Sequence, residues 1–294
     1  MSPTPSPVLP HALDLPIFRF LRDKRVVLAS ASPRRKELLE TSGLTPDIVP
    51  STFAENLPHG AYSNALAEYP IATAGEKAME VYERMIREDE RTAPELVISA
   101  DTVIIYPPQS TLDPSSSSSF SEPSSSSRGT RLTGLNTHIT SAEESEDLGV
   151  GEQQGEGRRD ELSWSGRRGG VSKILEKPMD RDDQMRMLSE MNGETCEVVT
   201  GVTIVYPTLV APGYKLRSIA VSSLVEFNHN SPELLKAYTK NGEGLDRAGG
   251  FAIQGLGAFL VKGIQGDYNN VVGFPTAAFW RWMEELYEDG VFDD

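Results

Sequence analysis

The chain of 294 residues holds a single cysteine, Cys196, which excludes an internal disulfide and is typical of a protein from a reducing compartment. No stretch approaches the run of about 18 apolar residues that a transmembrane helix needs, so no membrane partner is expected. The first residues also lack the basic and apolar regions of a secretory signal peptide. Together these absences predict a cytoplasmic protein.

Basic residues are outnumbered, with 28 Lys and Arg against 43 Asp and Glu, which gives a net charge of −15. Such a charge opposes the phosphate backbone of DNA or RNA, so no nucleic-acid polymer is expected as a partner. A small anionic ligand would need a local cluster of basic residues within this repelling field. The four histidines do not have the spacing of metal ligands.

Apolar residues are also scarce, at 38% of the chain, which indicates that part of it contributes no core. Prolines are frequent near the N-terminus, and we expect a flexible tail over residues 1–22. Residues 107–172 are rich in Ser, Gly and acidic side chains, a composition that buries too little apolar area to offset chain entropy. The sequence therefore predicts one domain over residues 23–294, interrupted by a disordered insert at 107–172.

Outside these two segments, short apolar runs alternate with amphipathic stretches that are bounded by Ser, Pro and Gly. Strands are expected at residues 25–30, 95–106, 196–206, 218–227, 249–255 and 258–266. Helices are expected at residues 32–43, 71–90, 180–193, 231–242 and 276–290. Alternation of strands and helices, followed by consecutive strands, predicts an α/β fold with helices packed on a mixed sheet.

The helix expected after Ser32 begins with three cations, Arg34, Arg35 and Lys36. Basic residues in a first helical turn oppose the helix dipole, at a cost of a few tenths to about 1 kcal/mol each. Their presence is reasonable if an anion binds at this helix end, where free N–H groups and guanidinium groups converge. A solvated basic turn is the alternative, and the residues alone favour neither.

Asp101 lies inside an apolar strand, where an unpaired carboxylate carries a large desolvation cost. It therefore indicates an ion pair or a metal site, although a carboxylate bonded to backbone N–H groups at a strand bend is an alternative. Gln254 precedes a glycine turn, and its amide is suited either to reading the edge of a base or to holding the turn itself. Lys177, Glu55 and Lys77 carry no signal on their own.

Taken in order, several motifs resemble those of the Maf family of nucleoside triphosphate pyrophosphatases. They are LASASPRRKELL, the EN of STFAEN, GEKA, ISADTVI, ILEKP, MNGETCEVVTGV and DRAGGFAIQGLGAFLVKGIQGDYNNVVGFP, which lie within about residues 26–106 and 173–285. The resemblance implies an elongated mixed β-sheet with packed helices and a central cleft, similar to the inosine triphosphate pyrophosphatases, and a homodimer. It implies a single catalytic domain that hydrolyses a nucleoside triphosphate between the α and β phosphates, releasing monophosphate and pyrophosphate. The implied cofactor is a divalent cation, Mg²⁺ or alternatively Mn²⁺ or Co²⁺.

The resemblance also implies the roles of individual residues, position by position. These are Asp101 as the proton acceptor; Arg34, Thr102 and Gln254 in substrate specificity; Ser32, Arg35, Lys77 and Lys177 in phosphate binding; and Glu55 with Asp101 at the metal. The chain departs from the pattern at Ala54, where the family often has a second acid before the glutamate.

The SPRR and IQG versions of the motifs resemble the subgroup that removes dTTP, UTP or modified nucleotides from the nucleotide pool. One alternative is specificity for 7-methyl-GTP, and another is a non-catalytic nucleotide sensor that regulates cell division. The intact Asp101, Glu55, Lys77 and Lys177 favour an enzyme over a sensor. The insert at 107–172 is a candidate for binding a protein partner of unknown identity.

Overall fold

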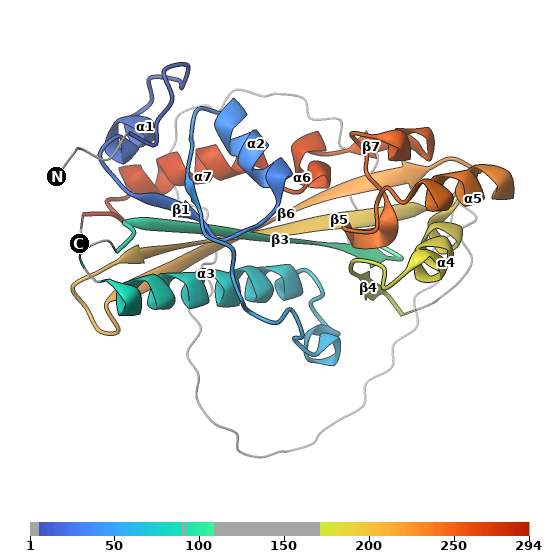
Figure 1. Cartoon of the computed structure of the whole chain (residues 1–294), viewed down its shortest axis with the longest axis horizontal. Coiled ribbons are helices and arrows are strands. Elements are labelled where there is room, and N and C mark those ends of the chain that lie inside the picture. The colour runs from blue at the N-terminus through green and yellow to red at the C-terminus, as the bar shows by residue number, and fades with distance from the viewer. Residues whose placement is uncertain (1–5, 90, 92, 109–170, 294) are drawn as a thin grey trace, which may run out of the picture. The chain divides into compact units, whose positions relative to one another are not determined.

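The computed structural model describes residues 6–89, 91, 93–108 and 171–293, and within them seven strands form one mixed sheet (Figure 1). In chain order the strands are β1 Val26–Leu28, β2 Asp47–Ile48, β3 Leu96–Tyr106, β4 Lys173–Leu175, β5 Thr195–Pro207, β6 Tyr214–Phe227 and β7 Val261–Gln265. Strand β1 pairs in parallel with β2 and β3, whereas β3, β5, β6 and β7 are antiparallel neighbours. The α/β fold with a mixed sheet is confirmed.

Helices cover both faces of this sheet, with α3 on one face and α7 on the other (Figure 1). Successive side chains of a strand point to opposite faces. Val97 of β3 therefore packs with Tyr82 of α3, whereas its neighbour Ile98 belongs to the cluster that contains Phe279 of α7. The helices are α1 Pro16–Leu21, α2 Pro33–Thr41, α3 Glu68–Glu88, α4 Arg181–Met191, α5 Pro232–Asn241, α6 Tyr268–Val272 and α7 Thr276–Glu288, with 3₁₀ turns η1 His59–Tyr62, η3 Ala248–Gly250 and η4 Leu256–Phe259.

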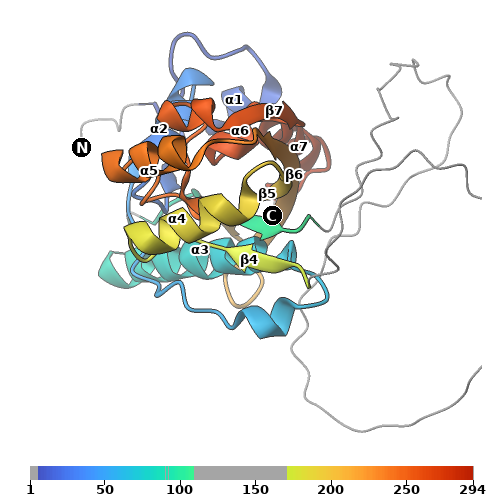
Figure 2. The ribbon, with the colours of Figure 1, turned by 90° about the vertical axis from the view of Figure 1, so that its right-hand side faces the viewer.

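Helices α4 and α5 form a second layer near the end of the sheet that carries β4 and β7 (Figure 2). Leu188 of α4 and Leu235 of α5 are buried together with Val198 of β5 and Phe251. Both helices begin with a side-chain cap, since Asp180 accepts a hydrogen bond from Asp183 N and Ser231 accepts one from Leu234 N. The segment after α5 leads to the candidate site, whose lining includes Asp246, Arg247 and Ala248.

One glycine permits the close approach of α3 to the sheet. Gly201 of β5 pairs with Asp101 of β3 across the antiparallel ladder. A Cβ atom at this position would overlap the backbone of Pro70 and Ile71 in the first turns of α3. Because Gly201 has no side chain, α3 lies directly against the strand pair that carries Asp101.

The flexible tail expected over residues 1–22 is wrong for the described part of that segment. Ile17, Phe18 and Leu21 of α1 are at most 3% exposed, and the Phe18 ring lies 4.2 Å from the ring of Trp280. Val8 forms an isolated bridge with Leu44. The frequent prolines indicated an extended tail, although the segment contains the short apolar helix α1. Burial of the α1 side chains against α7 holds the segment in place.

The strand expected at residues 249–255 is also wrong. Gly249 and Gly250 have φ angles of 68° and 76°, which lie in the left-handed region and are incompatible with a strand. The backbone N–H of Gly249 donates to Glu176 O, and that of Ala252 donates to the Tyr238 hydroxyl. This segment is therefore a turn that faces the site, and β7 begins only at Val261.

Most of the insert expected at 107–172, namely residues 109–170, lies outside the described residues. Its two ends meet, because Tyr106 of β3 pairs with Lys173 of β4 in an antiparallel register. Among the described residues, no helix combines the length and apolar character needed to cross a bilayer.

Candidate active site

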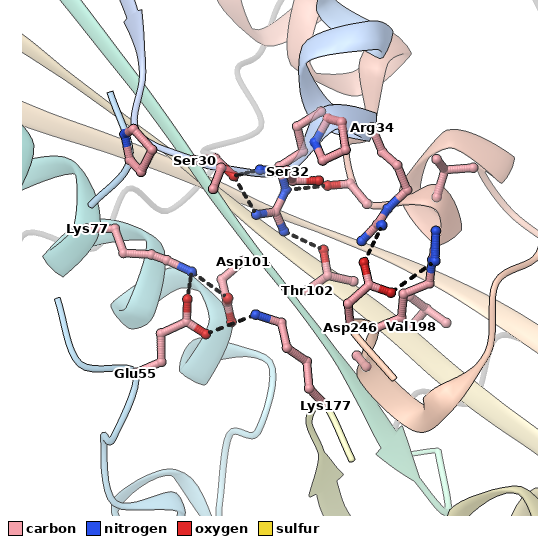
Figure 3. Close-up of a pocket in the computed structure, with 18 of the residues that line it drawn as sticks. Ser30, Ser32, Arg34, Glu55, Lys77, Asp101, Thr102, Lys177, Val198 and Asp246 are labelled. Carbon is pink, nitrogen blue, oxygen red and sulfur yellow. Dashed lines mark hydrogen bonds and ion pairs between the residues drawn. The ribbon is translucent and has the colours of Figure 1, made fainter. Parts of the chain in front are cut away.

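A pocket of about 340 Å³ lies beside β3, between the N-terminus of α2, the loop that follows β2 and the turn before η3 (Figure 3). All the residues to which the sequence assigns a role line it, namely Ser32, Arg34, Arg35, Glu55, Lys77, Asp101, Thr102, Lys177 and Gln254. They come from segments far apart in the chain, and the fold brings every one of them to this pocket.

Lys77 lies between two carboxylates of the pocket. Its side chain is 7% exposed, and Nζ donates to Glu55 Oε1 at 2.7 Å and to Asp101 Oδ1 at 2.9 Å (Figure 3). An ammonium group this deeply buried is costly unless it is paired, and the two carboxylates supply that pairing. Of the alternatives that the sequence leaves open for Asp101, the structure shows an ion pair, with Lys77 as the partner.

Glu55 lies on the loop after β2 and also faces Lys177, whose Nζ is 3.8 Å from Glu55 Oε2. Partial burial acts to raise the pKa of Glu55, but the positive charges of Lys77, Lys177 and Arg35 outweigh it and hold the pKa below its usual value. Glu55 is therefore ionised at neutral pH.

Arg35 points into the protein at the first turn of α2. Its Nε donates to Gly273 O at 3.0 Å, and its two terminal nitrogens donate to Ser30 Oγ at 3.3 Å and to Thr102 Oγ1 at 3.1 Å. Thr102 Oγ1 lies in turn 3.0 Å from Thr200 Oγ1. Burial lowers the pKa of Arg35, and the charge of Asp101 opposes this effect. These contacts fix the guanidinium group at one end of the pocket.

Arg34 points toward the opposite wall, where its Nη1 lies 3.1 Å from Asp246 Oδ2. Asp246 also accepts a hydrogen bond from Arg247, at 3.3 Å. The sequence reasoning missed Asp246 and Arg247, although both line the pocket. An Asp–Arg pair directly before the AGG run is the signal that would have identified them.

Ser32 is the N-cap residue of α2, as the sequence predicts, but its hydroxyl does not cap the helix. Its backbone N–H donates to Ser30 Oγ at 3.2 Å. Four apolar side chains of one hydrophobic cluster also line the pocket, as does the exposed Gln254; they are Ile104, Val198, Phe251 and Val271. The pocket thus combines charged side chains such as Lys77 and Arg35 with an apolar cluster and the amide of Gln254.

Positive charge exceeds negative charge among the pocket residues, although the whole chain carries a charge of −15. The pocket has five cations and three carboxylates, which are Arg34, Arg35, Lys77, Lys177 and Arg247 against Glu55, Asp101 and Asp246. This is the local basic cluster that an anionic ligand requires.

Two carboxylates of the pocket, those of Glu55 and Asp101, fit a divalent cation. Both contact the same Lys77 Nζ, so the two carboxylates lie close together on one side of the pocket. Mg²⁺ in proteins is commonly bound through one or two carboxylates together with water and substrate phosphates. Among the described residues, no cluster of three or more His, Cys, Asp or Glu side chains has the arrangement of a metal site.

A family model described as Maf-like protein matches residues 25–142 and 167–286, which is more than half of the chain. The chain belongs to the Maf family. The matched ranges contain every residue of the pocket described above, so this Maf pocket is built from the part of the sequence that the family shares.

Curated relatives share this Maf sequence over most of the chain. A dTTP/UTP pyrophosphatase of Schizosaccharomyces pombe is 32% identical over 96% of this chain and 92% of its own length. A probable bifunctional dTTP/UTP pyrophosphatase/methyltransferase protein of Homo sapiens is 34% identical over 92% of this chain, which spans only 34% of that longer protein. A dTTP/UTP pyrophosphatase of Agathobacter rectalis is 29% identical over 90% of this chain.

Proposed function

We propose that this protein hydrolyses dTTP and UTP to the nucleoside monophosphate and pyrophosphate. The observation that carries the proposal is the pair of carboxylates around the buried Lys77, within a pocket whose remaining cations match a triphosphate in charge. Membership of the Maf family and the names of its relatives support the same reaction.

Phosphate oxygens would be bound by the first turn of α2 and by the lysines. Arg35 is held in place by Ser30, Thr102 and Gly273, so little side-chain freedom is lost when a phosphate binds to it. Lys177, which is 60% exposed, can turn toward a phosphate from its place near Glu55. The Ser32 hydroxyl, which does not cap α2, adds a neutral hydrogen-bonding group.

Asp101 would accept the proton of the attacking water. Lys77 donates to Oδ1, and the other oxygen of Asp101 would serve as the proton acceptor. The water oxygen forms a bond to a phosphorus atom. At the same time, the bond breaks between that phosphorus and the oxygen that bridges the α and β phosphates. The bridging oxygen leaves with the electron pair, so monophosphate and pyrophosphate account for all atoms.

Glu55 and Asp101 would hold a divalent cation, Mg²⁺ or alternatively Mn²⁺ or Co²⁺, together with phosphate oxygens and water. Such an ion supplies charge neutralisation on the phosphate oxygens. Since the substrate itself completes the ligand set, we expect metal to bind far more tightly in the presence of a triphosphate than alone.

Base selection would depend on the apolar part of the pocket. Gln254 is an exposed residue of the pocket lining, and its side-chain amide can pair with the carbonyl and N3–H edge of uracil or thymine. Arg34, held by Asp246, would contribute to this selection, whereas Thr102 would act through Arg35. Specificity for 7-methyl-GTP is the alternative, and the panel of triphosphates described below distinguishes the two.

We also propose that the protein is a cytoplasmic homodimer and that the segment between β3 and β4 binds a protein partner. The free and buried Cys196 is compatible with a reducing compartment, and the burial that raises the pKa of its thiol makes it unreactive. The dimer rests on the resemblance to the Maf family alone.

A panel of triphosphates tests the proposed reaction. Pyrophosphate release would be measured for dTTP, UTP, CTP, GTP and 7-methyl-GTP with Mg²⁺ present, using Asp101→Asn as the blank. We expect the highest kcat/KM for dTTP and UTP. Preference for 7-methyl-GTP would overturn the substrate assignment. The absence of turnover with every nucleotide would favour the alternative of a non-catalytic nucleotide sensor.

A further inference from the structure

Glu55 reaches the pocket from a loop without regular secondary structure. Residues 49–58 are neither helix nor strand, and the Glu55 side chain is 37% exposed. From this loop, Glu55 contacts Lys77 and Lys177. Because a long side chain on an unsupported loop loses much conformational freedom when it is fixed, something must hold the loop if Glu55 is to stay at a metal.

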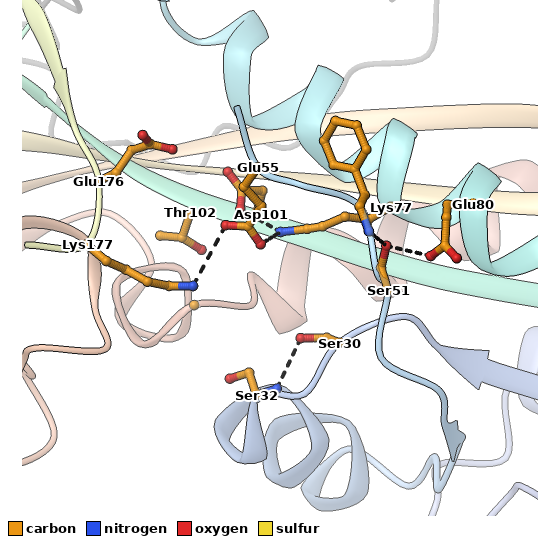
Figure 4. Close-up of polar contacts among 12 residues, drawn as sticks. Ser30, Ser32, Ser51, Glu55, Lys77, Glu80, Asp101, Thr102, Glu176 and Lys177 are labelled. Atoms are coloured by element: carbon orange, nitrogen blue, oxygen red, sulfur yellow. Dashed lines mark hydrogen bonds and ion pairs between the residues drawn. The ribbon is translucent and has the colours of Figure 1, made fainter. Parts of the chain in front are cut away.

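A single carboxylate, that of Glu80 on α3, binds the beginning of this loop (Figure 4). Glu80 Oε2 accepts hydrogen bonds from Ser51 Oγ at 2.7 Å and from Thr52 N at 2.9 Å. Glu80 Oε1 accepts from Thr52 Oγ1 at 2.9 Å and from Arg84 Nε at 2.7 Å. Arg84 also donates to Pro50 O at 2.9 Å, so the pair of side chains binds residues 50–52.

Glu80 and Lys77 are three residues apart on α3, and residues at this spacing lie on the same face of a helix. The same face of α3 therefore presents the ammonium group to the pocket and binds the loop that brings Glu55 to it. Glu55 follows Thr52 by only three residues, so displacement of the clamped segment would shift the Glu55 carboxylate. Glu80 itself does not line the pocket.

We propose that Glu80 is a positioning residue, which holds Glu55 beside Lys77 and Asp101 by clamping residues 50–52 to α3. The inference rests on the proposed function in one respect, since it takes the Glu55 carboxylate to be a metal ligand. Glu80 touches neither substrate nor metal and acts only through the loop.

Glu80→Gln tests this role, because the amide keeps the size of the side chain but loses the charge and one of the two acceptor oxygens. Loss of a group that orients a metal ligand typically weakens metal binding by about 10–100-fold. We expect a weakening in this range for Mn²⁺, measured by electron paramagnetic resonance in the presence of a non-hydrolysable α,β-imido analogue of dTTP. This readout needs no turnover, so it remains valid even if the proposed reaction fails.

Glu83→Gln is the matched control, since Glu83 lies on the same helix and accepts a hydrogen bond from Tyr214 outside the pocket. It should bind Mn²⁺ as the unmodified protein does. Equal Mn²⁺ affinity for Glu80→Gln and the control would overturn the proposal.

A double-mutant cycle with Glu55→Gln separates positioning from general destabilisation. If Glu80 acts through Glu55, adding Glu80→Gln to Glu55→Gln should reduce kcat/KM for dTTP by less than twofold, although alone it reduces kcat/KM by tenfold or more. Full additivity of the two losses would mean that Glu80 affects activity by another route, and the proposal would be rejected.

Discussion

Lys77 is the residue on which the charge balance of the pocket depends. Its Nζ contacts both Glu55 and Asp101, so two like charges are held close together by one cation between them. Without the ammonium group, the two carboxylates would face each other with no cation between them and would repel each other. The same geometry lowers the pKa of Glu55, so this carboxylate is ionised for the role proposed for it.

At Gln254, substitution by Glu tests base selection. Glu keeps the size of the side chain but replaces the amide donors with acceptors and adds a charge, so it opposes the carbonyl groups of uracil and thymine. We expect kcat/KM for dTTP and UTP to fall at least about tenfold, which corresponds to roughly 1.4 kcal/mol. Activity toward guanine nucleotides should fall less or rise. An equal loss for all triphosphates would show that Gln254 only holds its turn.

Sequence reasoning could identify residues whose type conflicts with their surroundings. Asp101 in an apolar strand and arginines at the start of α2 are of this kind, and both line the pocket. Lys77 and Glu55 became candidates only through the family resemblance. Asp246, Arg247 and Glu80 were missed, because a charged residue near a turn or on a helix surface is common, and only tertiary contacts distinguish these three.

Helix α3 is the element that organises the site. It carries Lys77 into the pocket, binds the Glu55 loop through Glu80, and lies against the strands at Gly201. Its amphipathic pattern predicted the helix, because burial of one face follows directly from the sequence. The distance between α3 and the sheet could not be predicted from the sequence, because it depends on Gly201, which lies in a strand more than a hundred residues away.

Gly201→Ala tests the close approach of α3. The added methyl group would overlap the backbone of Pro70 and Ile71, and relief of such overpacking typically costs about 1–3 kcal/mol of unfolding free energy. We expect this loss in denaturant unfolding, together with reduced kcat because Lys77 moves. Gly263→Ala is the control, since a Cβ atom there meets no neighbouring atom within 4 Å. Equal stability of the two variants would contradict the role given to Gly201.

Turns were the elements that the sequence predicted least well. The apolar residues at 249–255 have the composition of a strand, yet positive φ angles at Gly249 and Gly250 redirect the chain. Hydrogen bonds to Glu176 and Tyr238 then stabilise the turn. Such long-range partners leave no periodic pattern in the sequence, whereas the buried strands β3 and β5 do.

At the scale of the whole molecule, the net charge of −15 and the cations of the pocket would affect an anionic ligand over different distances. At physiological ionic strength the Debye length is about 8 Å, so remote surface acids are largely screened from a bound triphosphate. The pocket cations would then determine the binding of the proposed substrate. The global charge instead disfavours association with nucleic acids.

Replacement of residues 107–172 by a short glycine turn tests the single-domain organisation. The paired Tyr106 and Lys173 already place the two strand ends side by side, so a short turn can join them. The composition of the segment predicts no core contribution, and we expect kcat/KM and Tm to be nearly unchanged. A Tm lower by more than about 5 °C, or roughly 1 kcal/mol or more, would show that the segment packs on the domain.

The most direct test of the central claim is to identify the products of dTTP with the unmodified protein and with Asp101→Asn. We expect equimolar dTMP and pyrophosphate from the unmodified protein. For Asp101→Asn we expect a folded protein whose kcat is lower by about 10²–10⁴-fold, because the amide cannot accept the proton of water. Formation of dTDP and inorganic phosphate, or a variant that retains more than roughly a third of kcat, would contradict this claim.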